Sequence, residues 1–172
     1  PVKFCDPCSK VDLVVKGYDN HDYIQTGYGD DTVYACNGND TVITNCGDDV
    51  VYAGGGNDKV CLGSGNDTVY TGSGADTVDG GCGTDTASYI HSAAAVTVSL
   101  DGCTVGKGGD AEGDRLYCIE NLIGSNYDDK LSGSGAANVI DGGAGNDTIS
   151  GSSCDTIMGG VGNDVLIVNS SG

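Results

Sequence analysis

The sequence predicts an all-β fold made of short strands and glycine-rich turns. Three observations predict it: a nine-residue unit repeats without insertion from residue 17 to residue 88, glycine occupies 31 of the 172 positions, and no segment shows convincing helical amphipathicity. The hydrophobic fraction is only 38%, and the chain has no tryptophan and one phenylalanine. We therefore expect a thin interior of small β-branched residues and backbone, to which something else must add cohesion.

Residues 1–16 precede the repeats and are expected to form an N-terminal cap. They carry the apolar residues Val11, Leu13, Val14 and Val15, which suit either a cap or a contact within a polymer. The opening PVKFCDPCSK reads as a mature N-terminus left after removal of a leader, which favours secretion.

The first array covers residues 17–88 and holds eight nonapeptides, from GYDNHDYIQ to GGCGTDTAS. The eighth position is always apolar, as in Val33, Val51 and Val69, and the fourth is glycine in all units but the first. A six-residue turn followed by a three-residue strand, with its middle side chain inward, satisfies these regularities. The sixth position is aspartate in every unit: Asp22, Asp31, Asp40, Asp49, Asp58, Asp67, Asp76 and Asp85.

An interlude at residues 89–123 breaks the period. Alternating apolar residues from Ala94 to Leu100 and the run RLYCIENLI predict two longer strands joined by a glycine-rich loop. A second array follows at residues 124–167, with apolar positions at Leu131, Ile140, Ile149, Ile157 and Leu166. Residues 168–172 form a C-terminal tail, and the five segments are expected to make one continuous domain.

Two turns of the second array depart from the pattern. The unit at residues 151–158 is one residue short, and Asn138 replaces the aspartate of another unit. We expect both turns to bind metal poorly or not at all.

These units match GGxGxDxUx, and GGAGNDTIS matches it completely, so the chain resembles the RTX, or hemolysin-type calcium-binding, repeat family. The resemblance covers about three quarters of the chain. It implies a parallel β-roll solenoid in which two nonapeptides make one coil and calcium lies between stacked turns. Alternate aspartates would then stack along two edges, with Asp22, Asp40 and their successors on one edge and Asp31, Asp49 and theirs on the other.

The chemistry of the units agrees with this resemblance. Calcium prefers six to eight oxygen ligands from carboxylates and carbonyls, which a glycine-rich turn with one aspartate can supply. Without metal, each column of aspartates would be a row of like charges. The plainer interpretation is that aspartate only caps the turns, but asparagine and serine then ought to replace it more often. The expected ligands of several Ca²⁺ ions are Asp22, Asp31, Asp40, Asp49, Asp58, Asp67, Asp76, Asp85, Asp129, Asp147, Asp164, Gly29, Gly38, Gly47, Gly56, Gly65, Gly74, Gly83, Gly145 and Gly162.

Charge and cysteine content limit the possible partners. The net charge of −18 argues against nucleic acid, and no apolar run is long enough to span a membrane. Nine cysteines in a short chain favour an oxidising, extracellular compartment. Zinc binding by thiolates is a weaker explanation, because only Cys5 and Cys8 have zinc-like spacing. Plausible disulfides join these two to the first coils and Cys103 to Cys118, although the sequence does not fix the connectivity, whereas Cys46 and Cys82 should lie two coils apart and not pair. The odd count leaves a thiol free or paired with another chain.

Outward positions suggest two further features. Tyr34, Tyr52 and Tyr70 should form a stripe on one sheet, which either docks a polymer, a surface or another copy of the chain, or simply covers the sheet. Four sequons, at Asn39, Asn66, Asn146 and Asn169, are possible glycosylation sites, although three of them are the repeat's own Asn-Asp-Thr.

Catalysis is not expected. The only histidines, His21 and His91, should be exposed, and neither HExxH nor GxSxG occurs. The leading hypothesis is a secreted, calcium-binding structural protein of a matrix, adhesive or fibre that self-associates, with folding coupled to calcium binding. The alternative is a calcium-triggered folding module from a larger toxin, adhesin or exoenzyme. Ice binding by a flat threonine-rich face is a minor alternative.

Overall fold

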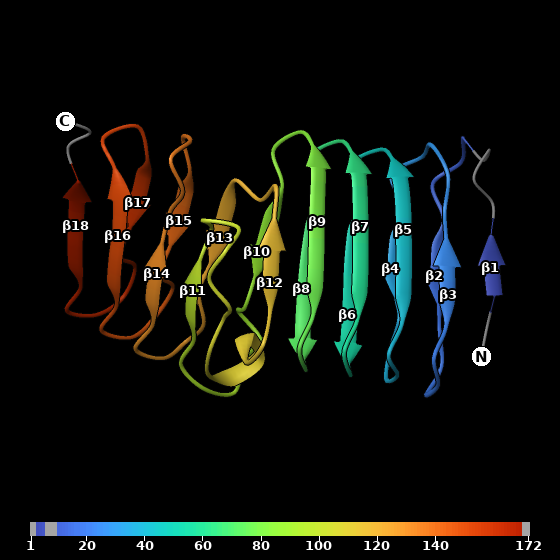
Figure 1. Cartoon of the computed structure of the whole chain (residues 1–172), viewed down its shortest axis with the longest axis horizontal. Coiled ribbons are helices and arrows are strands. Elements are labelled where there is room, and N and C mark those ends of the chain that lie inside the picture. The colour runs from blue at the N-terminus through green and yellow to red at the C-terminus, as the bar shows by residue number, and fades with distance from the viewer. Residues whose placement is uncertain (1–2, 6–9, 170–172) are drawn as a thin grey trace.

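The computed structural model describes residues 3–5 and 10–169 as a parallel β-solenoid. Figure 1 shows the coils following one another along the long axis, from β1 at one end to β18 at the other. Every pair of named strands is parallel, which confirms the predicted all-β parallel roll. The strands are β1 (Lys3–Cys5), β2 (Val14–Lys16), β3 (Tyr23–Gln25), β4 (Thr32–Tyr34), β5 (Thr41–Cys46), β6 (Val50–Gly55), β7 (Lys59–Ser64), β8 (Thr68–Ser73), β9 (Thr77–Cys82), β10 (Thr86–Ser88), β11 (Thr97–Ser99), β12 (Arg115–Tyr117), β13 (Asn121–Ile123), β14 (Lys130–Ser132), β15 (Val139–Asp141), β16 (Thr148–Ser152), β17 (Thr156–Met158) and β18 (Val165–Asn169).

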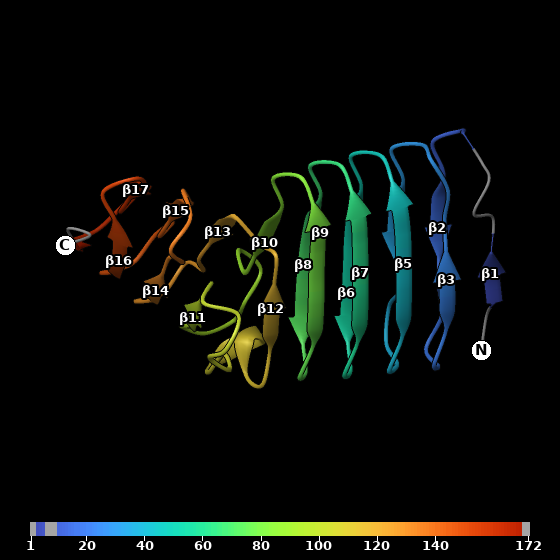
Figure 2. The ribbon, with the colours of Figure 1, turned by 45° about the horizontal axis from the view of Figure 1, so that its top comes forward.

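The chain alternates between sheets, so that two nonapeptides make one coil. One sheet has the order β1-β3-β5-β7-β9-β12, and the other has β17-β15-β13-β10-β8-β6-β4-β2. A third sheet has the order β11-β14-β16-β18 and starts with β11 in the interlude; after β12 its strands take the place of the first sheet in this alternation. Within the first array, partners lie 18 residues apart, as where Val42 pairs with Val60 and Val60 with Val78. The tilted view of Figure 2 shows the same succession of strands from β1 to β17.

The interior is a narrow column of small apolar side chains, as predicted. The eighth position of each unit is fully buried through the first array, for example at Ile24, Val51 and Val69. The first position also points inward, since Ala53, Leu62 and the Thr44 side chain have no exposed surface. This second inward row was not predicted.

The central strands are longer than predicted and include the buried first position. Strands β5 to β9 have six residues each instead of three, since the backbone goes on pairing through the first positions of the next unit. The predicted six-residue turn is therefore wrong for the central coils, where half of it belongs to a strand.

The prediction of longer strands in the interlude is also wrong. Residues 89–123 form the three-residue strands β11, β12 and β13 and a 3₁₀ helix, η1 (Gly109–Ala111). Val96, Val98 and Leu100 are buried, but Ala94 is exposed. Tyr89 is the largest fully buried side chain of the described core, and it adds the aromatic bulk that the repeats lack.

Candidate metal centres

Two columns of aspartates run along the edges of the first array, as predicted. In each column the backbone N–H of one aspartate donates to Oδ1 of the aspartate 18 residues later. The distances are 2.8 Å from Asp40 to Asp58 and 2.7 Å from Asp49 to Asp67. One oxygen of each carboxylate therefore holds the preceding coil, and the second oxygen stays available.

The interlude continues both columns with residues outside the repeat. Asp76 N–H donates to Asp114 Oδ1 at 2.8 Å, and Asp85 N–H donates to Glu120 Oε2 at 2.9 Å. Neither Asp114 nor Glu120 was among the predicted site residues, because no nine-residue spacing marks them. In the second array Asp129 N–H donates to Asp147, and Asp147 N–H to Asp164.

The carboxylates of the columns are buried, and many have an oxygen without a partner. Asp58 is 3% exposed, Asp67 is 1% exposed and Asp85 is fully buried. A buried, ionised oxygen with no hydrogen bond is costly, so these atoms need a cation or a proton. Within the described part of the chain, the Oδ2 atoms that are buried and accept no hydrogen bond are those of Asp40, Asp49, Asp58, Asp67, Asp76, Asp85 and Asp147.

The same burial perturbs the acidity of the columns. Burial raises the pKa of Asp58 and Asp49 to about 6, of Asp67 to about 7 and of Asp76 to about 8, against an ordinary value of 3.8. The hydrogen bond from the backbone N–H of the preceding coil lowers the pKa, and the neighbouring carboxylate raises it further. A metal-free roll at neutral pH therefore carries unfavourable buried charge.

The fourth-position glycines bring the turns close together. Gly56 has φ of 127°, and a Cβ there would collide with the carbonyl oxygen of Gly38 in the preceding coil. Gly74 stacks on Gly56 in the same way. A cradle lined with carbonyl groups and closed to side chains suits a small cation with oxygen ligands. The other predicted glycines are packed comparably against the backbone of an earlier segment: Gly29, Gly38, Gly47, Gly65, Gly83, Gly145 and Gly162.

These turns fit calcium on the chemistry of their donors. Across the described residues, no three side chains of His, Cys, Asp or Glu converge, so backbone oxygens would have to complete a site beside the carboxylate of a turn. Bound calcium would offset the charge of the buried carboxylates and bridge neighbouring turns. Asp58 and Asp67 would hold it through their unpaired Oδ2 atoms.

A few turns satisfy the acidic side chain without any ion. Asp22 Oδ2 accepts from Tyr18 N–H at 2.8 Å, and Asp31 Oδ2 accepts from Gly27 N–H at 3.2 Å. Asn138, which replaces an aspartate, donates from Nδ2 to the Glu120 carbonyl at 2.9 Å. Its amide thus donates to a carbonyl group, which a carboxylate could not do, and weak metal binding at this turn stays a prediction.

The tyrosine stripe on β4, β6 and β8 is a stacked column. The ring centroids of Tyr34 and Tyr52 are 4.8 Å apart, those of Tyr52 and Tyr70 are 4.6 Å apart, and His91 follows Tyr70 at 5.3 Å. Lys16 lies over the other end, 5.5 Å from the Tyr34 centroid. The ring faces cover one another, so the stripe presents ring edges and hydroxyl groups outward. Its use in docking stays a prediction.

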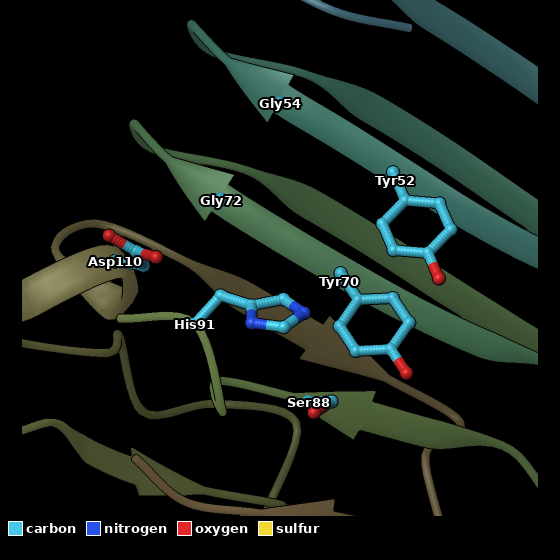
Figure 3. Close-up of a pocket in the computed structure, with 7 residues that line it drawn as sticks. All are labelled: Tyr52, Gly54, Tyr70, Gly72, Ser88, His91 and Asp110. Atoms are coloured by element: carbon cyan, nitrogen blue, oxygen red, sulfur yellow. The ribbon is translucent and has the colours of Figure 1, made fainter. Parts of the chain in front are cut away.

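Figure 3 shows the end of this column, where Tyr52, Tyr70 and His91 border a shallow cavity of about 130 Å³ together with Asp110. His91 is exposed, as predicted, and packs its ring on Tyr70. His21 is exposed too, and its Nδ1 accepts a hydrogen bond from Asn39 N–H at 2.7 Å. Both histidines therefore have structural contacts.

The structure does not join Cys103 to Cys118, the plausible pair of the interlude, because both side chains are free thiols. Cys46 pairs in register with Ser64 and Ser64 with Cys82, which confirms a separation of two coils. The prediction for Cys5 and Cys8 lies outside the described residues, since neither side chain is described.

Three of the predicted sequon asparagines belong to an outer ladder of the turns. Asn39 Oδ1 accepts from Asn57 N–H, Asn66 Oδ1 from Thr84 N–H, and Asn146 Oδ1 from Asn163 N–H. Asn169 is exposed at the end of β18. Glycosylation at these positions stays a prediction.

Comparisons with known proteins agree with this geometry. The family model of the RTX calcium-binding nonapeptide repeat (4 copies) matches residues 16–45, 37–69, 62–87, 120–153 and 155–170. No matching relative was found among curated proteins. Among the described residues no helix is long and apolar enough to cross a membrane. Because the family model covers well over half of the sequence and the turns have the expected stacked carboxylates, the chain belongs to the RTX calcium-binding nonapeptide repeat family.

Proposed function

We propose that this chain is a secreted, calcium-dependent structural protein, which folds as it binds calcium and assembles end to end in a matrix, adhesive or fibre. The observation that carries the calcium part is the row of buried Oδ2 atoms without partners, from Asp40 to Asp85 and again at Asp147. The assembly part rests on the open edge of β18 within the described sheets.

Coupled folding follows from the balance between a weak interior and buried charge. The core is built mainly from valine, with some leucine, isoleucine and alanine and one tyrosine, so it offers little apolar area per residue. Against it stand the stacked carboxylates, each of which costs free energy when ionised and dry. Calcium would remove this cost only in the folded chain, where the turns are stacked, and folding and binding would then be linked.

The end of the roll at β18 supports assembly. Leu166 pairs in register with the fully buried Ile149, yet Leu166 is 48% exposed because no further described coil covers it. Within the described sheets, β18 also has one unpaired edge. An apolar end with an open strand edge is suited to pairing with another β-edge, such as that of a second copy of the chain.

The case for secretion rests on the calcium-binding turns and not on the cysteines. The seven free cysteines in the described residues remove the argument from disulfides. Extracellular calcium modules, by contrast, work at high calcium concentrations with weak individual sites.

The same exposed end favours the second candidate, a calcium-triggered folding module of a larger toxin, adhesin or exoenzyme. In that case a neighbouring segment of the larger protein would cover Leu166. The two candidates share the calcium chemistry and differ in whether isolated chains associate.

Negative-stain microscopy and light scattering of the whole chain separate these candidates. We expect filaments in millimolar calcium and none in chelator, with loss of the β signal in circular dichroism in chelator. Leu166→Asp should give isolated short rods, whereas Val139→Asp, at a comparably exposed site on the side of the roll, should still give filaments. Isolated rods of the unaltered chain would favour the module, and a β signal that persists in chelator would refute coupled folding.

A further inference from the structure

The turns of the roll fall into two kinds, which differ in the hydrogen bonding of the sixth-position side chain. In closed turns the backbone N–H at the second position of the unit donates to that side chain. In open turns the second carboxylate oxygen has no partner. The closed turns are those of Asp22, Asp31, Asp129, Asn138 and Asp155, whose donors are Tyr18, Gly27, Ser125, Ser134 and Ser152.

The backbone at the second position follows the same division. In every open turn this residue has positive φ, for example 102° at Gly54 and 78° at Gly72. None of the five donors in the closed turns, all within the described residues, has positive φ. The seven residues at the second position of the turns with an unpaired buried oxygen are Cys36, Asn45, Gly54, Gly63, Gly72, Gly81 and Gly143.

Peptide geometry explains the correspondence. The N–H of the second residue and the C=O of the residue before it lie in one rigid peptide plane. A change in the sign of φ at the second position therefore reorients this plane, and its N–H, with respect to the rest of the turn. With negative φ, the N–H of Ser125 reaches Asp129 Oδ2 at 2.5 Å. With positive φ, no backbone donor reaches the Oδ2 of Asp58, which is left to another positive group.

Residue type alone does not decide the kind of turn. Gly27 occupies a closed turn although glycine tolerates positive φ, whereas Cys36 and Asn45 have φ of 80° and 73° in open turns. A non-glycine residue in this conformation costs about 1–2 kcal/mol, which the surrounding strands must offset. In β5, Asn45 pairs in register with Gly63 of the next coil.

We propose that the backbone at the second position selects which turns bind calcium, so that open turns take one ion each and closed turns take none. The inference rests on the proposed calcium function and deepens it. Asp22, Asp31 and Asp129 then act as turn caps, although their sequence motif includes the same aspartate. The turn of Asp164 is open by its backbone, with φ of 91° at Gly160, but lies in the last coil and is only partly buried.

Native mass spectrometry of the whole chain with calcium alone tests the proposal by counting ions. We expect one ion for each open turn with a buried unpaired oxygen, which makes seven, or eight if the terminal Asp164 turn is filled. A count outside this range overturns the selection rule, and a count of zero overturns the proposed calcium function itself.

Matched variants test the mechanism directly. Gly54→Ala should lose one ion although Asp58 is intact, because alanine disfavours positive φ and its Cβ would collide with the Cys36 carbonyl. Ser125→Ala, at the second position of a closed turn, should leave the count unchanged. In the same way Asp58→Asn should lose one ion and Asp31→Asn none. Loss of an ion from Ser125→Ala or Asp31→Asn contradicts the proposal. If a variant does not fold, the number of calcium ions bound by the unaltered chain decides the proposal.

Discussion

Replacing Asp67 by asparagine should make the roll more stable without calcium and less responsive to calcium. The new amide side chain would keep the Oδ1 acceptor that receives Asp49 N–H at 2.7 Å. It would lack the charge of the buried, unpaired Oδ2. The substitution therefore separates the metal role of this carboxylate from its role in holding the coils together.

The magnitude follows from the acidity of Asp67 in the metal-free roll. Its pKa is raised by burial to about 7 from 3.8, a difference of about 3 units. At ~1.4 kcal/mol per pKa unit, the ionised side chain costs about 4 kcal/mol at pH 8, and asparagine removes that cost. With calcium, the free energy of unfolding of the unaltered chain should rise by ~1.4 kcal/mol more than that of Asp67→Asn for each tenfold rise in calcium above the Kd of the Asp67 site. The two stability curves should cross near about a thousand times Kd.

Urea unfolding followed by circular dichroism, at a series of free calcium concentrations, measures both curves. A constant concentration of trimethylamine oxide would keep the metal-free protein folded at the start. Asp129→Asn is the control, because Asp129 accepts from Ser125 N–H and Oγ and from Val96 N–H. This variant should be destabilised equally at all calcium concentrations. Parallel curves for Asp67→Asn and the unaltered chain would refute the assignment of Asp67 as a ligand.

Three further predictions concern pH, the stacked glycines and the tyrosine column. In chelator the free energy of unfolding should rise as pH falls from about 8 to about 5. Burial raises the pKa of Asp76 to about 8, so the folded chain binds more protons than the unfolded chain in this range. Urea unfolding midpoints that rise with pH would contradict this. In the presence of calcium, Gly56→Ala should lower the free energy of unfolding by ~2 kcal/mol or more, since φ is 127° and the new Cβ would meet the Gly38 carbonyl. Gly135→Ala, with open space around it, should leave the same urea titration nearly unchanged. Tyr52→Ala should lose about 1–3 kcal/mol through its two stacked neighbours, with the ion count unchanged by native mass spectrometry; an unchanged urea midpoint would show that the stack adds no stability.

The repeat predicts much of this fold because each unit carries the same residue types at the same positions of its turn and strand. A fixed period places Val42, Val60 and Val78 in one buried row and their aspartates in one column, and the register confirms both. A solenoid of this kind needs only contacts between neighbouring coils, so the period determines the stacking.

The interlude shows where local patterns are insufficient. The alternation from Ala94 to Leu100 predicted a long strand, but only Thr97–Ser99 pairs, because the chain must leave one sheet and start another within a few residues. Asp114 and Glu120 join the aspartate columns at irregular spacings, which only the folded coil brings into register. The free thiols of Cys103 and Cys118 likewise depend on where the loop places them.

By itself, the sequence determined the nine-residue period, the buried apolar row and the stacked carboxylates, because these follow from residue types at fixed intervals. Only the tertiary structure decided which carboxylates keep an unpaired oxygen. That outcome follows the sign of φ at one position of each turn, which turns the rigid peptide unit with respect to the carboxylate. Residue type does not settle the sign: Gly27, which lacks positive φ, donates to Asp31 Oδ2, whereas Asn45, with φ of 73°, leaves Asp49 Oδ2 without a partner.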